Sequence, residues 1–280
     1  DARVLMELDQ LYKRLNRSPE ERIGFVEENL HTVNERDDMY LERVAVLNFM
    51  GEHEKALELL KKRQFHPWEG GEGKASGQYV YSIVELAKAE IEREAYKDAA
   101  ELLEQARHYP HNLGEGKLFG TQENDIFYWL GCACEGMGNQ EEAIMYFKKA
   151  TIGLDEPSAA MFYNDQQPDK IFYQGLAWKK LGENDKAIHI FNKLIKYGDQ
   201  HLNDQVKVDY FAVSLPNLLI FEDDLDIRNQ AHCHFIQGLG YLGLEKVTAA
   251  NIAFSKVLEL DAEHLGAKTH INMPIAYKNV

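Results

Sequence analysis

A pattern that recurs along the 280-residue chain is the feature that most constrains its fold. Three clear copies share one internal spacing and two looser copies precede them, so self-similar units follow one another for most of the chain. The clear copies are Phe127, Leu130, Gly131, Cys134, Ala143, Phe147; Ile171, Gln174, Gly175, Trp178, Ala187, Phe191; and His234, Gln237, Gly238, Tyr241, Ala250, Phe254. The looser copies are Tyr40, Val44, Leu47, Ala56, Leu60 and Ile83, Leu86, Ala87, Glu90, Ala99, Leu103.

Small residues in each copy stand where two helices must approach closely. Gly or Ala at the eighth position and Ala at the twentieth allow two antiparallel helices to pack, and the large residue at the twenty-fourth fills the groove between neighbours. Gly51, Gly138 and Gly182 fall where the first helix of a pair should end. One helix pair alone leaves an apolar face bare, so the pairs must stack.

This pattern resembles the tetratricopeptide repeat (TPR). The resemblance implies an all-α, TPR-like right-handed helical solenoid of antiparallel helix pairs with elongated inter-repeat loops. We expect five repeats within 36–264, with a long insertion at 196–227; the repeats are expected at about 36–75, 79–117, 123–165, 168–205 and 228–264. Residues 1–35 are expected to form an N-terminal helical cap or degenerate repeat, because Ser18, Pro19 and Glu21 are typical of a helix start. Residues 265–280 show no clear pattern and are expected to form a C-terminal tail.

The junctions between repeats are longer than the pattern requires. The marker residues Ala56, Ala99, Ala143, Ala187 and Ala250 stand 43, 44, 44 and 63 residues apart, whereas an ordinary TPR unit takes about 34. The extra chain lies between the second helix of one unit and the first helix of the next, so the loops should gather at one edge of the solenoid. The first two loops are similar: Pro67-Trp68-Glu69-Gly70-Gly71-Glu72-Gly73-Lys74 recurs as Pro110-His111-Asn112-Leu113-Gly114-Glu115-Gly116-Lys117.

The copied loops have two interpretations. In one, Pro and Gly form turns while Glu and Lys pair or cap helix ends. In the other, backbone N–H groups and lysine ammonium groups face an anionic or hydroxyl-rich ligand, with aromatic rings offering stacking surfaces. The candidate ligand-binding residues of these loops are Trp68, Glu69, Glu72, Lys74, Tyr79, His111, Glu115 and Lys117. The inward first helices add Tyr128, Tyr173, Gln174, His234 and Gln237, which we expect to be exposed, whereas Trp178 is expected to pack.

Composition and motifs exclude several functions. The net charge of −15 and the scattered basic residues argue against binding to nucleic acid. We find no run of about 18 apolar residues, so we expect no membrane partner. Only three cysteines occur, which favours a cytoplasmic location.

Catalytic and metal sites are likewise not expected. His232, Cys233 and His234 are consecutive on a predicted helix and diverge by about 100° per residue, so they cannot converge on one metal ion. Gly-Glu-Gly-Lys is not a nucleotide-binding P-loop, because neither Lys74 nor Lys117 is followed by Ser or Thr. We therefore predict no enzyme activity and no cofactor. Clustered acids such as 222–226 are expected to form solvated turns, with a Ca²⁺ or Mg²⁺ site as the alternative.

The chain also resembles the C-terminal TPR region of large bacterial proteins whose N-terminal domain of unknown function is of the sugar-mutarotase-like β-sandwich type. The likeness rests on 66–74, 112–117 and 215–224. It implies a non-catalytic scaffold for a protein or peptide partner. The N-terminal domain of the same polypeptide is one candidate partner. The alternative is an accessory carbohydrate-binding part whose Gly-Glu-Gly-Lys loops line a glycan cleft.

Overall fold

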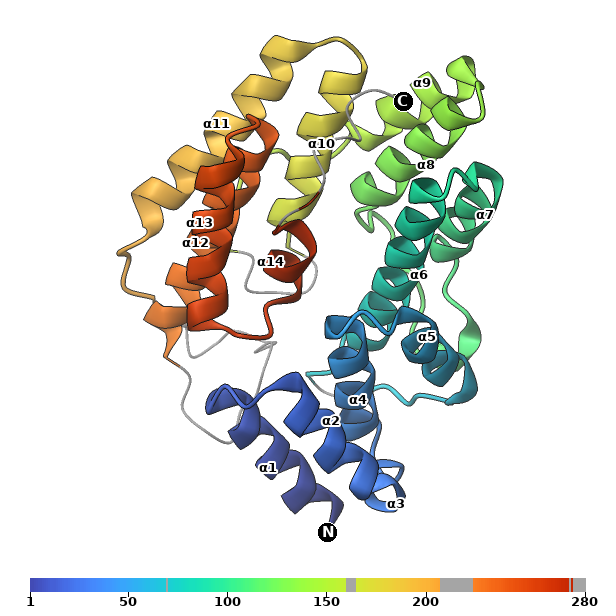
Figure 1. Ribbon diagram of the computed structural model, residues 1–280, viewed down its shortest axis with the longest axis vertical. Helices are drawn as coiled ribbons and strands as arrows, with labels where there is room; N and C mark the ends of the chain where they lie inside the picture. Colours follow the sequence, from blue (N-terminus) through green and yellow to red (C-terminus); the bar gives the residue numbers. More distant parts are fainter. Residues whose placement is uncertain (69, 160–164, 207–223, 272, 274–280) are drawn as a thin grey trace.

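The computed structural model describes residues 1–280 except 69, 160–164, 207–223, 272 and 274–280. Within the described residues every regular element is a helix, and the helices stack as antiparallel pairs along a curved path (Figure 1). The fold is therefore the all-α helical solenoid that the repeat pattern predicts. None of the described helices has the length and apolar character needed to cross a membrane.

The helix pairs follow the chain in order. The N-terminal unit contains α1 (Ala2–Arg14), α2 (Pro19–Glu28) and the short α3 (Leu30–Val33). The five pairs are α4 (Asp37–Phe49) with α5 (His53–Lys62), α6 (Lys74–Glu92) with α7 (Tyr96–Ala106), α8 (Asn124–Gly136) with α9 (Gln140–Ala150), α10 (Pro168–Lys180) with α11 (Asn184–His201), and α12 (Leu225–Gly243) with α13 (Val247–Leu260). The second long loop contains a 3₁₀ turn, η1 (His111–Leu113), and α14 (Leu265–His270) follows the last pair.

Element boundaries differ from the sequence expectation in three places. The start of α2 is as predicted, since Ser18 and Glu21 form a reciprocal capping box with Pro19 in the first turn. However, α6 begins at Lys74, ahead of the expected 79, so this lysine belongs to a helix and not to a flexible loop. The α11 helix continues to His201, so the range expected as an insertion begins inside a helix. The expected tail contains α14.

The core is built on complementary sizes at the eighth and twenty-fourth positions of each pair. A Cβ added to Gly131, Gly175 or Gly238 would lie 2.4–2.5 Å from the ring of Phe147, Phe191 or Phe254 of the same pair. The two looser copies have Val44 with Leu60 and Ala87 with Leu103, all fully buried. A larger residue at one position is thus matched by a smaller one at the other, which keeps the helices of each pair at a similar distance.

We expect this complementarity to appear as energetic coupling. Gly175→Ala should destabilise the protein by about 1–3 kcal/mol, because the new methyl group overlaps the Phe191 ring. Phe191→Leu alone should also destabilise, by leaving a cavity. The double variant recreates the Ala87–Leu103 combination, so its loss should fall short of the sum by at least about 0.5 kcal/mol in urea unfolding.

Gly24→Ala is the matched control, because no other atom lies within 4 Å of the added Cβ. It should be neutral or stabilising by up to about 1 kcal/mol, since alanine favours helix more than glycine does. Strict additivity of Gly175→Ala and Phe191→Leu would contradict the size-matching account.

Candidate functional site: a central cavity inside the solenoid

The inner surface of the curved stack borders a solvent-open cavity of about 1490 Å³. The first helix of every pair contributes to its wall, namely α4, α6, α8, α10 and α12. The N-terminal α1, the end of α13, the C-terminal α14 and several segments between the repeats also line it. A volume of this size exceeds the roughly 300–1,000 Å³ typical of small-molecule pockets, and it therefore suits an extended ligand.

The cavity wall is rich in ionisable groups with an acidic excess. Five basic and eight acidic residues line it: Lys13, Arg14, Lys74, Lys170 and Arg228 against Glu42, Glu85, Glu115, Asp125, Asp169, Asp224, Glu259 and Asp261. Some of them pair within the wall, as Lys170 Nζ does with Asp125 Oδ2 at 2.6 Å. Burial acts to lower the pKa of Lys170, but Asp125 and Asp169 outweigh it and raise that pKa. Burial raises the pKa of Asp169 and lowers that of Lys74.

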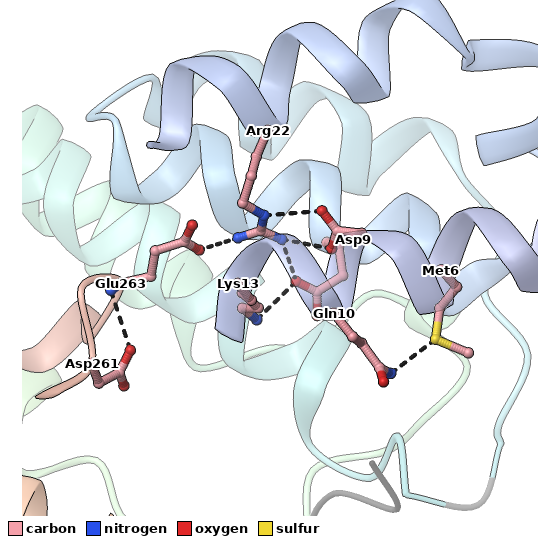
Figure 2. A network of polar contacts seen from close by, with 8 residues as sticks. Met6, Asp9, Gln10, Lys13, Arg22, Asp261 and Glu263 are labelled. Atoms are coloured by element: carbon pink, nitrogen blue, oxygen red, sulfur yellow. Dashed lines mark hydrogen bonds and ion pairs between the residues drawn. The ribbon is translucent and has the colours of Figure 1, made fainter. Parts of the chain in front are cut away.

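A buried arginine joins the two ends of the stack beside this cavity (Figure 2). Arg22 of α2 is fully buried and donates from Nε to Asp9 Oδ1 at 2.9 Å and from Nη2 to Asp9 Oδ2 at 2.6 Å. Its Nη1 bonds to Glu263, 241 residues away in the turn between α13 and α14. Arg22 Nη2 also lies 3.2 Å from Glu42 Oε2. The first and last helical units are thereby closed into a ring.

Electrostatic interactions within this cluster favour the ionised forms of Arg22 and Glu42. Burial by itself would raise the pKa of Glu42, but Lys13 and Arg22 lower it to about 2. Burial would likewise lower the pKa of Arg22, and the bond to Asp9 together with Glu42 and Glu263 raises it instead. Asp9 differs, because burial dominates and raises its pKa.

The short helix α14 lies against the inner face and forms part of the cavity wall. Thr269 Oγ1 lies 2.9 Å from Tyr81 Oη of α6, and the Lys268 ammonium lies 5.5 Å from the ring centre of Phe49 in α4. His270 is buried among aromatic rings and its Nδ1 donates to the Gly266 carbonyl at 2.7 Å. This bond makes Nδ1 the protonated nitrogen of a neutral ring. Burial lowers the pKa of His270 to about 4.

Glu115 in the second copied loop caps the helix that follows the first loop. Its carboxylate accepts hydrogen bonds from Gly73 N at 2.8 Å, Ser76 N at 3.3 Å and Ser76 Oγ at 3.1 Å. These donors are at the start of α6, where backbone N–H groups lack helical partners. The helix-capping interpretation of the loops is therefore confirmed for Glu115, which also lines the cavity.

Other contacts join the second copied loop to the end of α5 and to the residues just before the first copied loop. Asn112 Nδ2 donates to the carbonyls of Leu60 and Arg63 at 2.8 Å each, and Phe65 N donates to Asn112 O at 2.8 Å. At Gly114, which has φ +78°, a Cβ would lie 2.6 Å from the Phe65 carbonyl oxygen. The elongated loops thus add contacts between successive repeats.

The remaining loop candidates are dispersed. Lys117 Nζ donates to Arg107 O at 3.2 Å and to Glu123 Oε1 at 2.5 Å. Trp68 is half-buried with its ring over Gly71, whereas Glu72 and His111 are exposed. Glu69 lies outside the described residues. Of this loop set, Lys74 and Glu115 reach the cavity.

The aromatic and amide candidates on the first helices are less accessible than we expected. Tyr79, Tyr128, Tyr173, Gln174 and Gln237 are all buried. Gln174 Nε2 donates to Leu154 O at 2.9 Å, and Gln237 Nε2 donates to Asp199 Oδ1 at 2.7 Å, so both amides serve internal packing. His234 pairs with Gln237 Oε1 at 2.9 Å. Tyr173 alone of these lines the cavity, and Trp178 packs against the core as predicted.

Sequence reasoning missed most of the wall, although the repeat carries a signal for it. Residues two and six places before the small eighth-position residue lie one helical turn apart and face the same side. The position six residues before the small residue holds Tyr81, Asp125, Asp169 and His232. The position two residues before it holds Glu42, Glu85 and Tyr173. All seven of these residues line the cavity. Reading these two positions down the repeats would have identified the inward face.

Comparisons with known proteins identify a repeat family in two of the five helix pairs. Residues 125–151 and 171–197 each match a family model described as tetratricopeptide repeat. These ranges cover most of the α8–α9 and α10–α11 pairs, so this part of the chain is a TPR region. Within the described residues, no group of three or more His, Cys, Asp or Glu could hold a metal ion.

Two solved structures are similar over most of their length. One is YrrB, described as a TPR protein with an unusual peptide-binding site. The match to YrrB has 18% sequence identity and a TM-score of 0.28, and it covers 86% of this chain and 93% of that chain. The other is the MamA protein, with 21% identity, 85% and 96% covered, and a TM-score of 0.27.

We predict that Glu115 stabilises the start of α6. Glu115→Ala should lower the free energy of unfolding by about 1–2 kcal/mol, since it removes a cap that accepts from two backbone N–H groups. Glu72→Ala, at the corresponding exposed position of the first loop, should change it by less than about 0.5 kcal/mol. Equal losses for the two variants in urea unfolding would contradict the capping role.

His270 should make stability depend on pH between about 6.5 and 4. Its folded-state pKa of about 4 lies below the ordinary value of 6.5, so in this window the unfolded chain binds a proton that the folded chain does not. Stability is then fully present above the window and is lost as pH falls through it. Lys88 disfavours the imidazolium from α6 and His264 disfavours it from the preceding turn, whereas Glu85 favours it.

The measurement compares urea unfolding of wild type and His270→Phe across this range. The wild type should lose up to about 3 kcal/mol relative to the variant between pH 6.5 and 4. His31→Gln, at an exposed site, should keep the wild-type slope. Parallel curves for wild type and His270→Phe would show that this ring is not the neutral buried group described.

Proposed function

We propose that this chain is a non-catalytic interaction scaffold that holds a peptide segment of a protein partner in its central cavity. The single observation that carries the proposal is the position of the cavity, which the first helix of all five pairs lines. Solenoid repeats use such extended inner surfaces for binding. The TPR matches to the α8–α9 and α10–α11 pairs support the same class of function.

The chemistry of the wall suits a peptide with basic character. An excess of carboxylates over cations on the lining attracts positive charge. Tyr81 and Tyr173 add ring surfaces and hydroxyl groups to the same wall. Leu118 and Phe119, both exposed at the lining, offer apolar contacts to a side chain of the partner.

The internal contacts of the copied loops favour the scaffold over the carbohydrate alternative. The carboxylate of Glu115 is occupied by the start of α6, and the ammonium of Lys117 is occupied by Glu123 and the Arg107 carbonyl. A glycan cleft built on these loops would have to break both sets of contacts. The peptide proposal needs neither change.

A substitution that fills the cavity tests the proposal. Gly77 is exposed on α6, lines the cavity and has no other atom within 4 Å of an added Cβ, so Gly77→Trp should project an indole into the cavity without strain. Peptides selected from a random phage-displayed library on the wild-type chain should bind Gly77→Trp at least tenfold more weakly by isothermal titration calorimetry. Gly24→Trp on α2, equally open but outside the cavity, should bind like wild type.

Two results would overturn the proposal. One is a library that yields no saturable peptide ligand. The other is equal binding of the selected peptides to Gly77→Trp and wild type. A saturable response to a glycan array that is lost in Trp68→Ala/Lys74→Ala, with the peptide library silent, would favour the carbohydrate alternative.

A further inference from the structure

The segment Asp261–Ile271, here called the strap, crosses the inner face that the proposed function assigns to a partner. A helix that merely ended the solenoid would pack on the last pair alone. The strap instead reaches both sides of the ring. At its start Glu263 bonds to Arg22 of α2, and near its end Thr269 Oγ1 meets Tyr81 Oη of α6 (Figure 2 shows the first contact).

Strap side chains fit sites formed by several repeats. The His270 ring lies 5.5 Å from Phe172 and 6.1 Å from Tyr173, both on α10, and 6.0 Å from Phe235 on α12. His264 lies 4.7 Å from Phe235 by ring centres. Ala267 is fully buried, and the Gly266 backbone comes so close to Phe235 that an added Cβ would lie 2.6 Å from Cζ. The strap thus has the contacts of a bound peptide.

The strap depends for its order on contacts with other helices, which include Phe49 of α4 against Lys268 and Phe254 of α13 against His270. Its helix α14 has six residues, and an isolated helix needs about 12–15 residues to be even marginally stable in water. Its order therefore comes from the surface beneath it. A competing segment that makes the same contacts can replace it without unfolding any helix pair.

We propose that the strap is a built-in occupant of the binding face, and that a partner binds by displacing it with a short segment of like chemistry. The proposal rests on the proposed function. The displacing segment would carry an imidazole or aromatic ring at the position of His270. It would carry a hydroxyl group at the position of Thr269 and a small residue at the position of Ala267. Only the strap-free form binds. The apparent affinity for an added segment is therefore the intrinsic affinity multiplied by the fraction of chains whose strap is open.

Loosening the strap should therefore strengthen binding, the reverse of what damage to a binding site does. The probe is a fluorescent synthetic peptide with the sequence of residues 261–273, titrated by anisotropy. Gly266→Ala places a methyl group 2.6 Å from Phe235 Cζ, which should loosen the strap, and it changes no residue of the repeat helices beneath the strap. It should therefore bind the peptide at least tenfold more tightly than wild type. Gly24→Ala should behave like wild type, and a peptide with alanine at the positions of Thr269 and His270 should bind Gly266→Ala at least tenfold more weakly.

Hydrogen–deuterium exchange supplies the second readout. The amides of 265–271 should exchange faster in Gly266→Ala than in wild type, while those of α8 and α9 keep their protection. Ala267→Glu, which puts a carboxylate at a fully buried position, should release the strap in the same way. The proposal is overturned if a released strap brings no gain in peptide binding, or if neither variant releases it, since the strap would then be ordinary core.

The two proposals fail differently. Library-selected peptides that bind wild type and Gly266→Ala equally would support the proposed function and overturn the strap displacement. The opposite outcome is that the strap peptide binds Gly266→Ala while the library yields no ligand for wild type or for Gly266→Ala. This result would support the strap as an occupant of the inner face and would overturn the proposed function.

Discussion

Close packing of a large residue on a small one, repeated once per helix pair, determines the geometry on which everything else depends. Phe147, Phe191 and Phe254 each lie against a glycine of the facing helix, and that contact fixes the distance between the two helices of their pair. Because side chains in such a core have little free volume, the distance is set by contact and not by helix propensity. Similar pairs then stack with a regular offset, and the first helices form a continuous inner face.

Ring closure changes the character of this solenoid. In an open repeat protein each unit contacts only its neighbours, so stability is close to a sum of local terms. The bonds from Arg22 to Asp9 and Glu263 join the first unit to the last, and the contact between Tyr81 and Thr269 joins α6 to α14. Partial opening at one place then strains contacts elsewhere. A buried arginine among carboxylates contributes less to net stability than to holding one specific geometry, since desolvation offsets much of the attraction.

The sequence predicts contacts between residues of the same repeat and does not predict contacts between residues far apart in the chain. Gly131 and Phe147 are sixteen residues apart by their numbers, within one unit, so spacing alone identifies their contact. The same is true of the capping box at Ser18. By contrast, Arg22 and Glu263 are 241 residues apart and Tyr81 and Thr269 are 188 apart. Those contacts depend on the accumulated curvature of five pairs, and no repeat pattern encodes it.

The candidate site illustrates the same division. Tyr128 and Gln174 are predicted to bind a ligand because of their residue types. Both are buried, because their positions on the helices face the neighbouring pair. Asp125 and Asp169 look like ordinary surface acids in the sequence, and the stacking of α8 against α10 brings them to a shared cavity. Packing constrains the small and large core positions and leaves the inward positions free to differ from one pair to the next. For the proposed scaffold, binding specificity would therefore depend on the inward positions, and the strap covers the part of the inner face around His270.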